Sequence, residues 1–132
     1  MVNRVAKGKR AEREFEKYCQ MLGYETWKPA WQRYGSKDIF NLADIIAIDK
    51  ETVLFIQVKT NMSDFYKARK QAKEFMKNRN INDLFVVVAC KIKGKVWRVW
   101  VYNKEEEDKV IDFDKTAEKM SCLRKHESNE NS

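Results

Sequence analysis

The sequence predicts an α/β fold in which helices flank a mixed sheet of five strands. Residues 41–60 contain two apolar, β-branched runs joined by a short polar turn, which indicates a β-hairpin. Residues 84–91 form one uninterrupted apolar run of strand length, typical of a central strand. Residues 5–22 and 63–79 instead repeat their apolar residues at helical spacing. The order of helix, three strands, helix and two strands is that of an α/β sandwich.

The first helix is expected over residues 5–22, and Gly23 provides its C-terminal stop. Its apolar face consists of Ala11, Phe15, Tyr18, Cys19 and Leu22. Glu12 lies roughly 60° around the helix from Phe15, at the shoulder of that face. A glutamate at this position can reach past the edge of the core towards a neighbouring sheet, although a solvated side chain is the ordinary outcome.

The hairpin follows a first strand, expected over residues 24–31, and a polar loop at residues 32–40. Its two strands are expected at residues 43–49 and 52–60, around a turn of two residues. In that register Asp49 faces Thr52. The polar loop contains two cations that could contact a phosphate backbone, namely Arg33 and Lys37.

The same register puts Asp44 opposite Gln57. Because alternate side chains of a strand share a face, Gln57 and Lys59 point the same way. A carboxylate, an amide and an ammonium then converge at one end of an apolar hairpin. Two interpretations are open. These are ordinary polar residues at strand ends, or they form a metal-dependent phosphodiesterase centre, in which oxygen ligands hold a divalent cation and a lysine positions water or stabilises charge.

The second helix is expected over residues 63–79, with Ser63 as its N-cap. Its buried stripe consists of Phe65, Ala68, Ala72, Phe75 and Met76. Much of the remaining surface is cationic, through Lys67, Arg69, Lys70, Lys73 and Lys77. A solvated charged face explains these cations nearly as well as a contact with nucleic acid does.

The last strand is expected over residues 95–102. Its alternation puts Trp97 and Val99 on one face and Arg98 and Trp100 on the other. Trp100 could stack on a base, but we favour packing in the core or in an interface.

The composition changes at residue 103. Residues 105–108 are an acidic run, residues 111–123 are expected to form a short helix, and residues 126–132 are expected to be disordered. We therefore expect a core domain at residues 1–102, followed by an acidic linker, a short helix and a tail at residues 103–132.

Composition limits the class of protein. At 132 residues with 43% hydrophobic content, the chain is expected to be one globular domain, and no apolar run approaches the roughly 20 residues of a membrane span. The basic N-terminus lacks the apolar region of a signal peptide. Cys19, Cys90 and Cys122 are widely spaced, which argues for a reducing, cytoplasmic location and against a disulfide framework or zinc site. The single histidine, His126, lies in a polar segment, so histidine-based catalysis is not expected.

The charge is uneven along the chain. Residues 103–132 contain 6 Lys/Arg and 9 Asp/Glu, a net charge of −3, whereas residues 1–102 contain 21 and 11, a net charge of +10. A basic body on so small a protein favours a polyanionic partner, most often nucleic acid bound through its phosphates.

Together these residues resemble the PD-(D/E)xK nuclease superfamily, and most closely the archaeal-type Holliday junction resolvases. The resemblance covers residues 5–102. Its motifs are Lys7-Gly8 and Glu12 in KGKRAERE, the Gly35-Ser36 loop, Asp44 in ADIIAI, Gln57-Val58-Lys59 in place of Glu-Val-Lys, and Trp97-Arg98. Each motif is short, but their order and spacing together are fairly specific.

The resemblance implies a restriction-endonuclease-like core and an Mg²⁺-dependent endonuclease, with Mn²⁺ as a possible substitute, that works on branched DNA as a homodimer. Asp44, Gln57 and the backbone carbonyl of Val58 would be metal ligands. Glu12 would be an outer metal or water ligand, and Lys59 the catalytic lysine. The DNA-binding residues expected, with Ser36 in a mobile substrate loop, are Lys7, Lys9, Arg10, Arg33, Ser36, Lys37, Lys67, Lys70 and Lys73. The protein would act in the cytoplasm, or in the host cell if it is viral.

Gln57 departs from the family, which has an acidic residue at this position. An amide oxygen can bind a hard cation but brings no charge, which predicts weaker metal binding. Mrr-type restriction enzymes resemble this chain in using Gln-x-Lys. Three functions therefore stay open: a resolvase that cuts four-way junctions by paired phosphodiester hydrolysis, a related nuclease acting on other duplex or branched DNA, and a nucleic-acid-binding module that does not cut.

Overall fold

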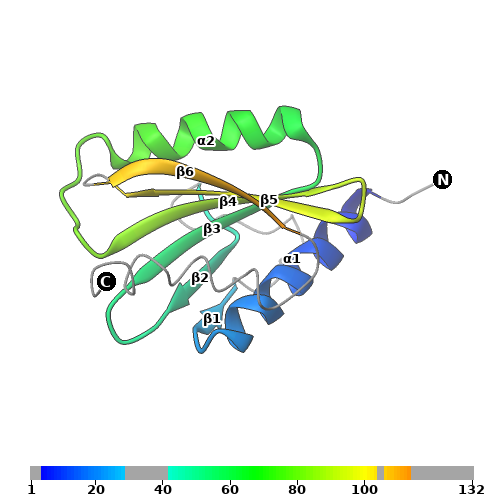
Figure 1. Ribbon diagram of the computed structural model, residues 1–132, viewed down its shortest axis with the longest axis horizontal. Coiled ribbons are helices and arrows are strands. Elements are labelled where there is room, and N and C mark those ends of the chain that lie inside the picture. Colours follow the sequence, from blue (N-terminus) through cyan, green and yellow to red (C-terminus); the bar gives the residue numbers. More distant parts are fainter. Residues whose placement is uncertain (1–3, 29–41, 104–105, 114–132) are drawn as a thin grey trace.

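The computed structural model describes residues 4–28, 42–103 and 106–113. The elements in chain order are α1 (Arg4–Met21), β1 (Glu25–Trp27), β2 (Ile45–Ile48), β3 (Val53–Lys59), α2 (Met62–Met76), β4 (Leu84–Ile92), β5 (Val96–Asn103) and β6 (Glu106–Phe113). The strands form a single sheet in the order β1-β2-β3-β4-β5-β6. The two helices lie on opposite faces of this sheet (Figure 1).

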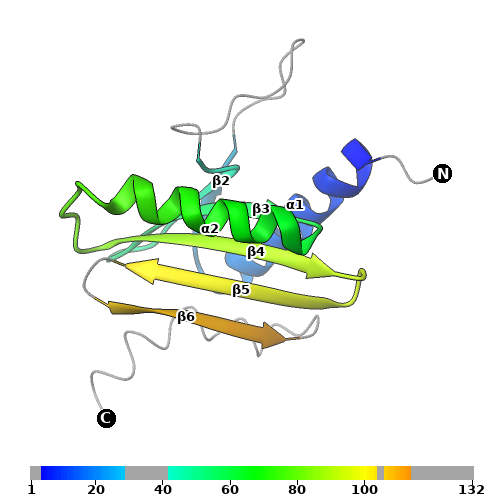
Figure 2. The ribbon, with the colours of Figure 1, turned by 90° about the horizontal axis from the view of Figure 1, so that it is seen from above.

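The sheet is mixed, as predicted. β3 and β4 are parallel, and α2 is the crossover between them, whereas every other neighbouring pair is antiparallel. Figure 2 shows α2 lying along β4, with α1 on the far side of the sheet. The apolar run that was expected to be a central strand is therefore covered on both faces.

α1 covers one face of the sheet with the apolar residues predicted for it. Phe15 is fully buried, and its ring lies 5.2 Å from that of Trp97 between ring centroids. The helix ends as expected at Gly23, whose φ of 95° suits a residue without a Cβ. Its polar side is tied to β4 by an ion pair between Glu14 and Lys91.

α2 covers the other face with the predicted stripe, in which Phe65, Ala68, Ala72 and Met76 are buried. The expected N-cap is wrong: the cap is Asn61, whose side-chain oxygen accepts a hydrogen bond from the Asp64 backbone nitrogen at 2.8 Å. Ser63 lies inside the first turn. Asparagine and serine are about equally good caps, so the sequence alone does not choose between them.

Trp100 belongs to the α2 side of the core. Its relative exposure is 0%, and its ring stacks on Tyr102 at a centroid distance of 5.4 Å. This agrees with the packing role that we favoured and leaves no face of Trp100 accessible to a base. Trp97 lies on the other face of β5, as the alternation predicted.

The sheet has one more strand than predicted. All five expected strands are present, but β6 pairs antiparallel with β5 as a sixth. Residues 106–113 were expected in a linker beyond the core domain, and the short helix was expected to begin at Ile111. Both expectations are wrong here because pairing with the edge of β5 outweighs the acidic composition of the segment. The rest of the expected helix and tail lies outside the described residues.

The first expected strand is shorter than predicted, covering Glu25–Trp27. Pro29 and the polar loop at residues 32–40 lie outside the described residues. In the part of the chain that is described, neither helix is long and apolar enough to span a bilayer.

Candidate active site

The β2–β3 hairpin has the register that the sequence predicted. The two strands pair from Ile48 and Val53 to Ile45 and Ile56. The turn is closed by Asp49, whose Oδ1 accepts hydrogen bonds from the backbone nitrogens of Glu51 at 2.9 Å and Thr52 at 2.8 Å. An aspartate that bonds its own turn explains a tight loop that has no Asn-Gly pair.

Asp44 lies where this ladder stops. Its backbone N–H donates to the Ile56 carbonyl at 2.8 Å, and its Oδ2 accepts a hydrogen bond from the Val58 backbone N–H at 2.9 Å. The carboxylate thus takes the place of a strand partner and is held against β3. This is the region in which the hairpin was predicted to gather its polar groups.

Gln57 and Lys59 share one face of β3, and their side chains meet. Gln57 is 5% exposed. Hydrogen bonding assigns its amide so that Nε2 donates to the Leu42 carbonyl at 3.1 Å and Oε1 accepts from the Lys59 ammonium at 3.3 Å. A buried amide with both ends satisfied fixes the lysine beside it. The Leu42 contact could not be predicted, because a backbone carbonyl has no signature in the residue pattern.

Glu12 lies on α1, which covers the opposite face of the sheet from Gln57 and Lys59. Its side chain is half-buried. The preceding residue, Ala11, packs in the same core cluster as Val58. Within the described residues, no three His, Cys, Asp or Glu side chains are grouped closely enough to hold a metal ion. The oxygen donors at this end of the hairpin are the Asp44 carboxylate, the Gln57 amide and the backbone carbonyls of β3.

Comparison with known proteins decides the family. A family profile described as archaeal Holliday junction resolvase (Hjc) matches residues 3–127. The chain belongs to this family. The match extends past residue 102, where the resemblance seen in the sequence ended, and takes in β6.

The fold is similar to the 1.6 Å structure of Hjc, a Holliday junction resolvase from the archaeal hyperthermophile Archaeoglobus fulgidus, with a TM-score of 0.45 and 21% sequence identity over 84% of this chain and 86% of that chain. The comparison with curated protein sequences produced no match.

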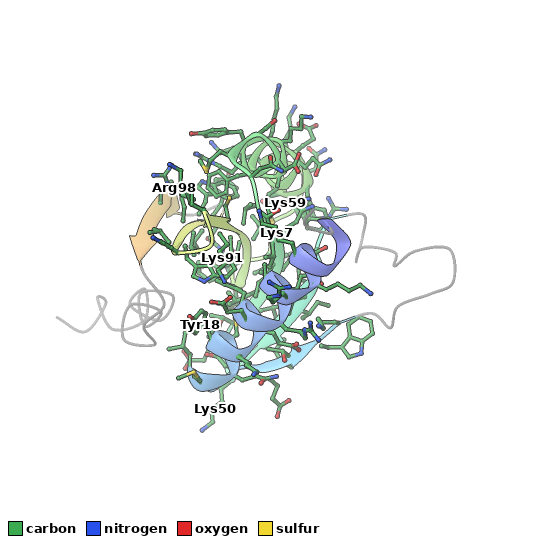
Figure 3. All side chains as sticks on the ribbon, turned by 90° about the vertical axis from the view of Figure 1, so that its right-hand side faces the viewer. Lys7, Tyr18, Lys50, Lys59, Lys91 and Arg98 are labelled. Atoms are coloured by element: carbon green, nitrogen blue, oxygen red, sulfur yellow. The ribbon has the colours of Figure 1, made fainter. Side chains whose placement is uncertain are left out.

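Membership of the archaeal Holliday junction resolvase family, which is part of the PD-(D/E)xK superfamily, makes this protein a nuclease of branched DNA. The structure describes the positions of six of the cations that were predicted to bind DNA. Lys7, Lys9 and Arg10 are exposed on α1, and Lys67, Lys70 and Lys73 are exposed on α2. In the view of Figure 3, Lys7 of α1 and Lys59 of β3 are labelled next to each other. The other DNA-binding residues expected, Arg33, Ser36 and Lys37, lie outside the described residues.

Proposed function

We propose that this resolvase hydrolyses phosphodiester bonds with a divalent metal ion at a centre built from Asp44, Gln57 and Lys59. The observation that carries the proposal is the contact between Gln57 and Lys59 at the end of β3 where the Asp44 carboxylate is bonded to the Val58 N–H, within a family of junction-cutting nucleases. None of the three is needed to form the hairpin core, which consists of apolar residues.

The donors available suit Mg²⁺, with Mn²⁺ as a substitute. Carboxylate, amide and backbone carbonyl oxygens are hard ligands, which both cations prefer. Asp44 would supply the charge at the centre, with Gln57 Oε1 and the Val58 carbonyl as neutral ligands and Glu12 as an outer ligand reaching from α1. When bound, the metal would polarise the phosphoryl oxygen and lower the pKa of bound water.

The protein groups have separate tasks in this reaction. The Val58 N–H orients the carboxylate of Asp44 through the bond to Oδ2. Gln57 holds the ammonium of Lys59 at 3.3 Å from its amide oxygen. A fixed ammonium stabilises negative charge as it develops on the phosphate, and it can orient the attacking water. Because these donors and acceptors are already in place, little reorganisation is needed when the DNA binds.

We propose that the enzyme acts as a homodimer. Two strands of a junction must be cut, and each chain has one set of Asp44, Gln57 and Lys59. An apolar surface suited to self-association lies on β1 and β2, where Trp27 is 57% exposed and Ile48 is 40% exposed. Trp27 pairs with Ile46, which lies two residues before Ile48 on β2. The side chains of Trp27 and Ile48 therefore project from the same face of the sheet. Large exposed apolar residues grouped in this way favour an interface.

Contacts to the DNA backbone would come from the cations of both helices. The residues proposed are Lys7, Lys9 and Arg10 on α1, Lys67, Lys70 and Lys73 on α2, and Arg33, Ser36 and Lys37 from the segment between β1 and β2. Such contacts position the substrate without reading its sequence. We also place the enzyme inside the cell, or the host cell of a virus, because that is where branched DNA is processed.

Cleavage of an immobile four-way junction, beside a linear duplex of the same sequence, tests the proposal. We expect paired, symmetric nicks in the junction with Mg²⁺ or Mn²⁺, no cutting with EDTA, and no cutting by Asp44→Ala. Equal cutting of the duplex would favour the alternative of a nuclease with broader substrates, which the Gln-x-Lys motif permits. Tight binding without cutting under any metal condition would contradict hydrolysis and leave a DNA-binding module.

A further inference from the structure

We propose that the turn between β4 and β5 binds the backbone of a DNA arm through Lys93 and Lys95 at its tip. The phosphates held there are distinct from the phosphate that is cut. The inference rests on the proposed function, because it takes the junction to be cut at the end of β3. It adds to that function an element of the sheet that has no part in the proposed centre or in the cationic surfaces of the two helices.

The β4–β5 turn is tight. The Lys95 backbone N–H donates to the Ile92 carbonyl at 3.0 Å, which closes a turn around Lys93 and Gly94. Both central residues have positive φ, 53° for Lys93 and 71° for Gly94. This is the combination found in type I′ turns, which suit the twist of paired strands. The tip of the hairpin is therefore held in one conformation, and its side chains start from fixed positions.

Lysine is an unusual residue for the first central position of such a turn. A positive φ brings the Cβ of an L residue close to the following carbonyl oxygen, which favours Gly, Asn or Asp there. Of the described residues other than glycine, only Lys93 has a positive φ. Another residue would thus suit the turn itself better. A conformational cost that is kept at an exposed position points to a function for the side chain.

The turn lies beyond the end of β3 that carries Lys59. β3 and β4 are parallel and Lys59 pairs with Cys90, so β4 continues past the level of Lys59 to Ile92 before the turn begins at Lys93. At about 3.3 Å per residue, the Lys93 Cα is roughly 10 Å further along the strand direction than the Lys59 Cα. Figure 1 and Figure 2 show the turn at the same end of the molecule as the first residues of α1 and α2. DNA held at Lys59 can therefore continue towards the turn.

The two lysines of the turn differ from the lysine that precedes them. Lys91 is half-buried, and its ammonium pairs with Glu14 of α1. Lys93 and Lys95 are exposed, and neither side chain makes a hydrogen bond or an ion pair with another residue of the described segments. The acidic residue of β6 that is nearest to the turn in register, Asp112, pairs three residues into β5 from Lys95. Two exposed ammonium groups on a fixed turn suit phosphates, which a lysine binds as a point charge.

The test measures binding without cutting. Junction affinity is measured in metal-free buffer over a range of salt, with Asp44→Ala as the parent protein. Lys93→Asn and Lys95→Gln are added to the parent singly and together. Lys50→Asn is the matched control, because Lys50 is an exposed lysine in the turn of the β2–β3 hairpin, at the opposite end of β3 from Lys59.

Loss of one phosphate contact should lower the slope of log affinity against log salt by about 0.9. We expect that decrease for each single variant and about twice that decrease for the double variant. If the affinities converge near 1 M salt, a slope difference of about 0.9 makes binding about eightfold weaker at about 0.1 M. Slopes for the Lys93 and Lys95 variants equal to that of Lys50→Asn would overturn the proposal.

Thermal melting separates this role from a structural one. Asparagine adopts a positive φ more readily than lysine, so Lys93→Asn should melt at a higher temperature than the parent while it binds the junction less tightly. Lys93→Arg keeps the charge and should keep the salt slope. A lysine retained only for the turn would give the opposite result, a lower melting temperature for Lys93→Asn with an unchanged slope, and that result would contradict the proposal.

A second measurement locates the phosphates. Single phosphates of the junction are replaced by uncharged methylphosphonates, one position at a time. At one position away from the cut, the replacement should weaken binding by the parent and have no further effect on Lys93→Asn. Additive losses at every position would exclude a specific contact. Cleavage by the wild-type chain is recorded separately, so that failure to hydrolyse DNA is distinguished from failure of the phosphate contacts.

Discussion

Oδ2 of Asp44 lies 2.9 Å from the backbone nitrogen of Val58, so one carboxylate both closes the end of the hairpin ladder and faces the proposed catalytic centre. The two roles depend on different properties of the side chain. The hydrogen bond needs only an acceptor oxygen, whereas tight binding of a divalent metal ion at the proposed centre also depends on the negative charge that Asp44 supplies. Substitutions at this position can therefore separate stability from activity.

Asp44→Asn is expected to abolish cleavage while leaving stability almost unchanged, because an amide oxygen can still accept from the Val58 N–H. Asp44→Ala should abolish cleavage too and lower the free energy of unfolding by about 1–3 kcal/mol, since the N–H then loses its partner. Urea denaturation and a junction-cleavage assay would be run on both variants. DNA affinity should change little in either, because it is spread over many cations. A fully active Asp44→Asn would exclude a charged role for this carboxylate.

Gln57→Glu is expected to have opposite effects on metal binding and on stability. The added charge should tighten Mg²⁺ binding. A carboxylate cannot donate to the Leu42 carbonyl, however, so the metal-free protein should lose about 1–3 kcal/mol of stability at neutral pH. Unfolding measured with EDTA and then with Mg²⁺ would reveal both effects. Equal stability of the wild type and Gln57→Glu in EDTA would argue against the hydrogen bond from Gln57 to the Leu42 carbonyl.

Stability is expected to fall at alkaline pH because of Cys19. Burial, with a further contribution from the charge of Glu16, raises the pKa of this thiol from 9.0 to about 12. Below pH 9 the thiol is protonated in both the folded and the unfolded state, so it adds no pH dependence. Between the two values the unfolded chain loses the proton first, and stability falls as pH rises, by at most about 1.4 kcal/mol per pH unit.

Cys19→Ala isolates this effect, because every other titrating group is shared with the wild type. Unfolding free energies would be compared at pH 8 and pH 10.5. The difference between the two proteins should shrink at the higher pH, and a difference that stays constant would contradict a buried, protonated thiol.

The exposed apolar surface of β1 and β2 gives a prediction about assembly. The chain has a mass of 15.8 kDa, and light scattering should give about twice this value if two copies associate. Trp27→Glu and Ile48→Glu are expected to yield monomers, because each introduces two facing charges into a two-fold interface. Ile81→Glu is the matched control, since Ile81 is 49% exposed outside this surface. An unchanged mass for both β1–β2 variants would place the interface elsewhere.

The hairpin was the most predictable part of the molecule. Its register followed from a loop of two residues and from alternation along the strands, both of which are local properties. The meeting of Gln57 with Lys59 followed from the same alternation. The roles of Asp44 and Glu12 in binding metal stay predictions, since they depend on a ligand and on contacts between distant elements.

Other features were beyond sequence reasoning for physical reasons. The N-cap at Asn61 could not be told from Ser63, because both residue types cap helices well. β6 was missed because its acidic residues mask its apolar ones, Val110, Ile111 and Phe113. Pairing with β5 decides the structure there, and such a long-range contact leaves only a weak local signal.

β6 ends the sheet on one side, and its composition has a consequence for the protein at high concentration. The outer N–H and C=O groups of an edge strand can pair with any other exposed strand, which leads to aggregation. Four of the eight residues of β6 are acidic, and two such edges brought together would repel one another. The acidic residues of β6 therefore disfavour edge-to-edge polymerisation. β6 also pairs along β5, which is rich in tryptophan and valine and would otherwise be the edge strand.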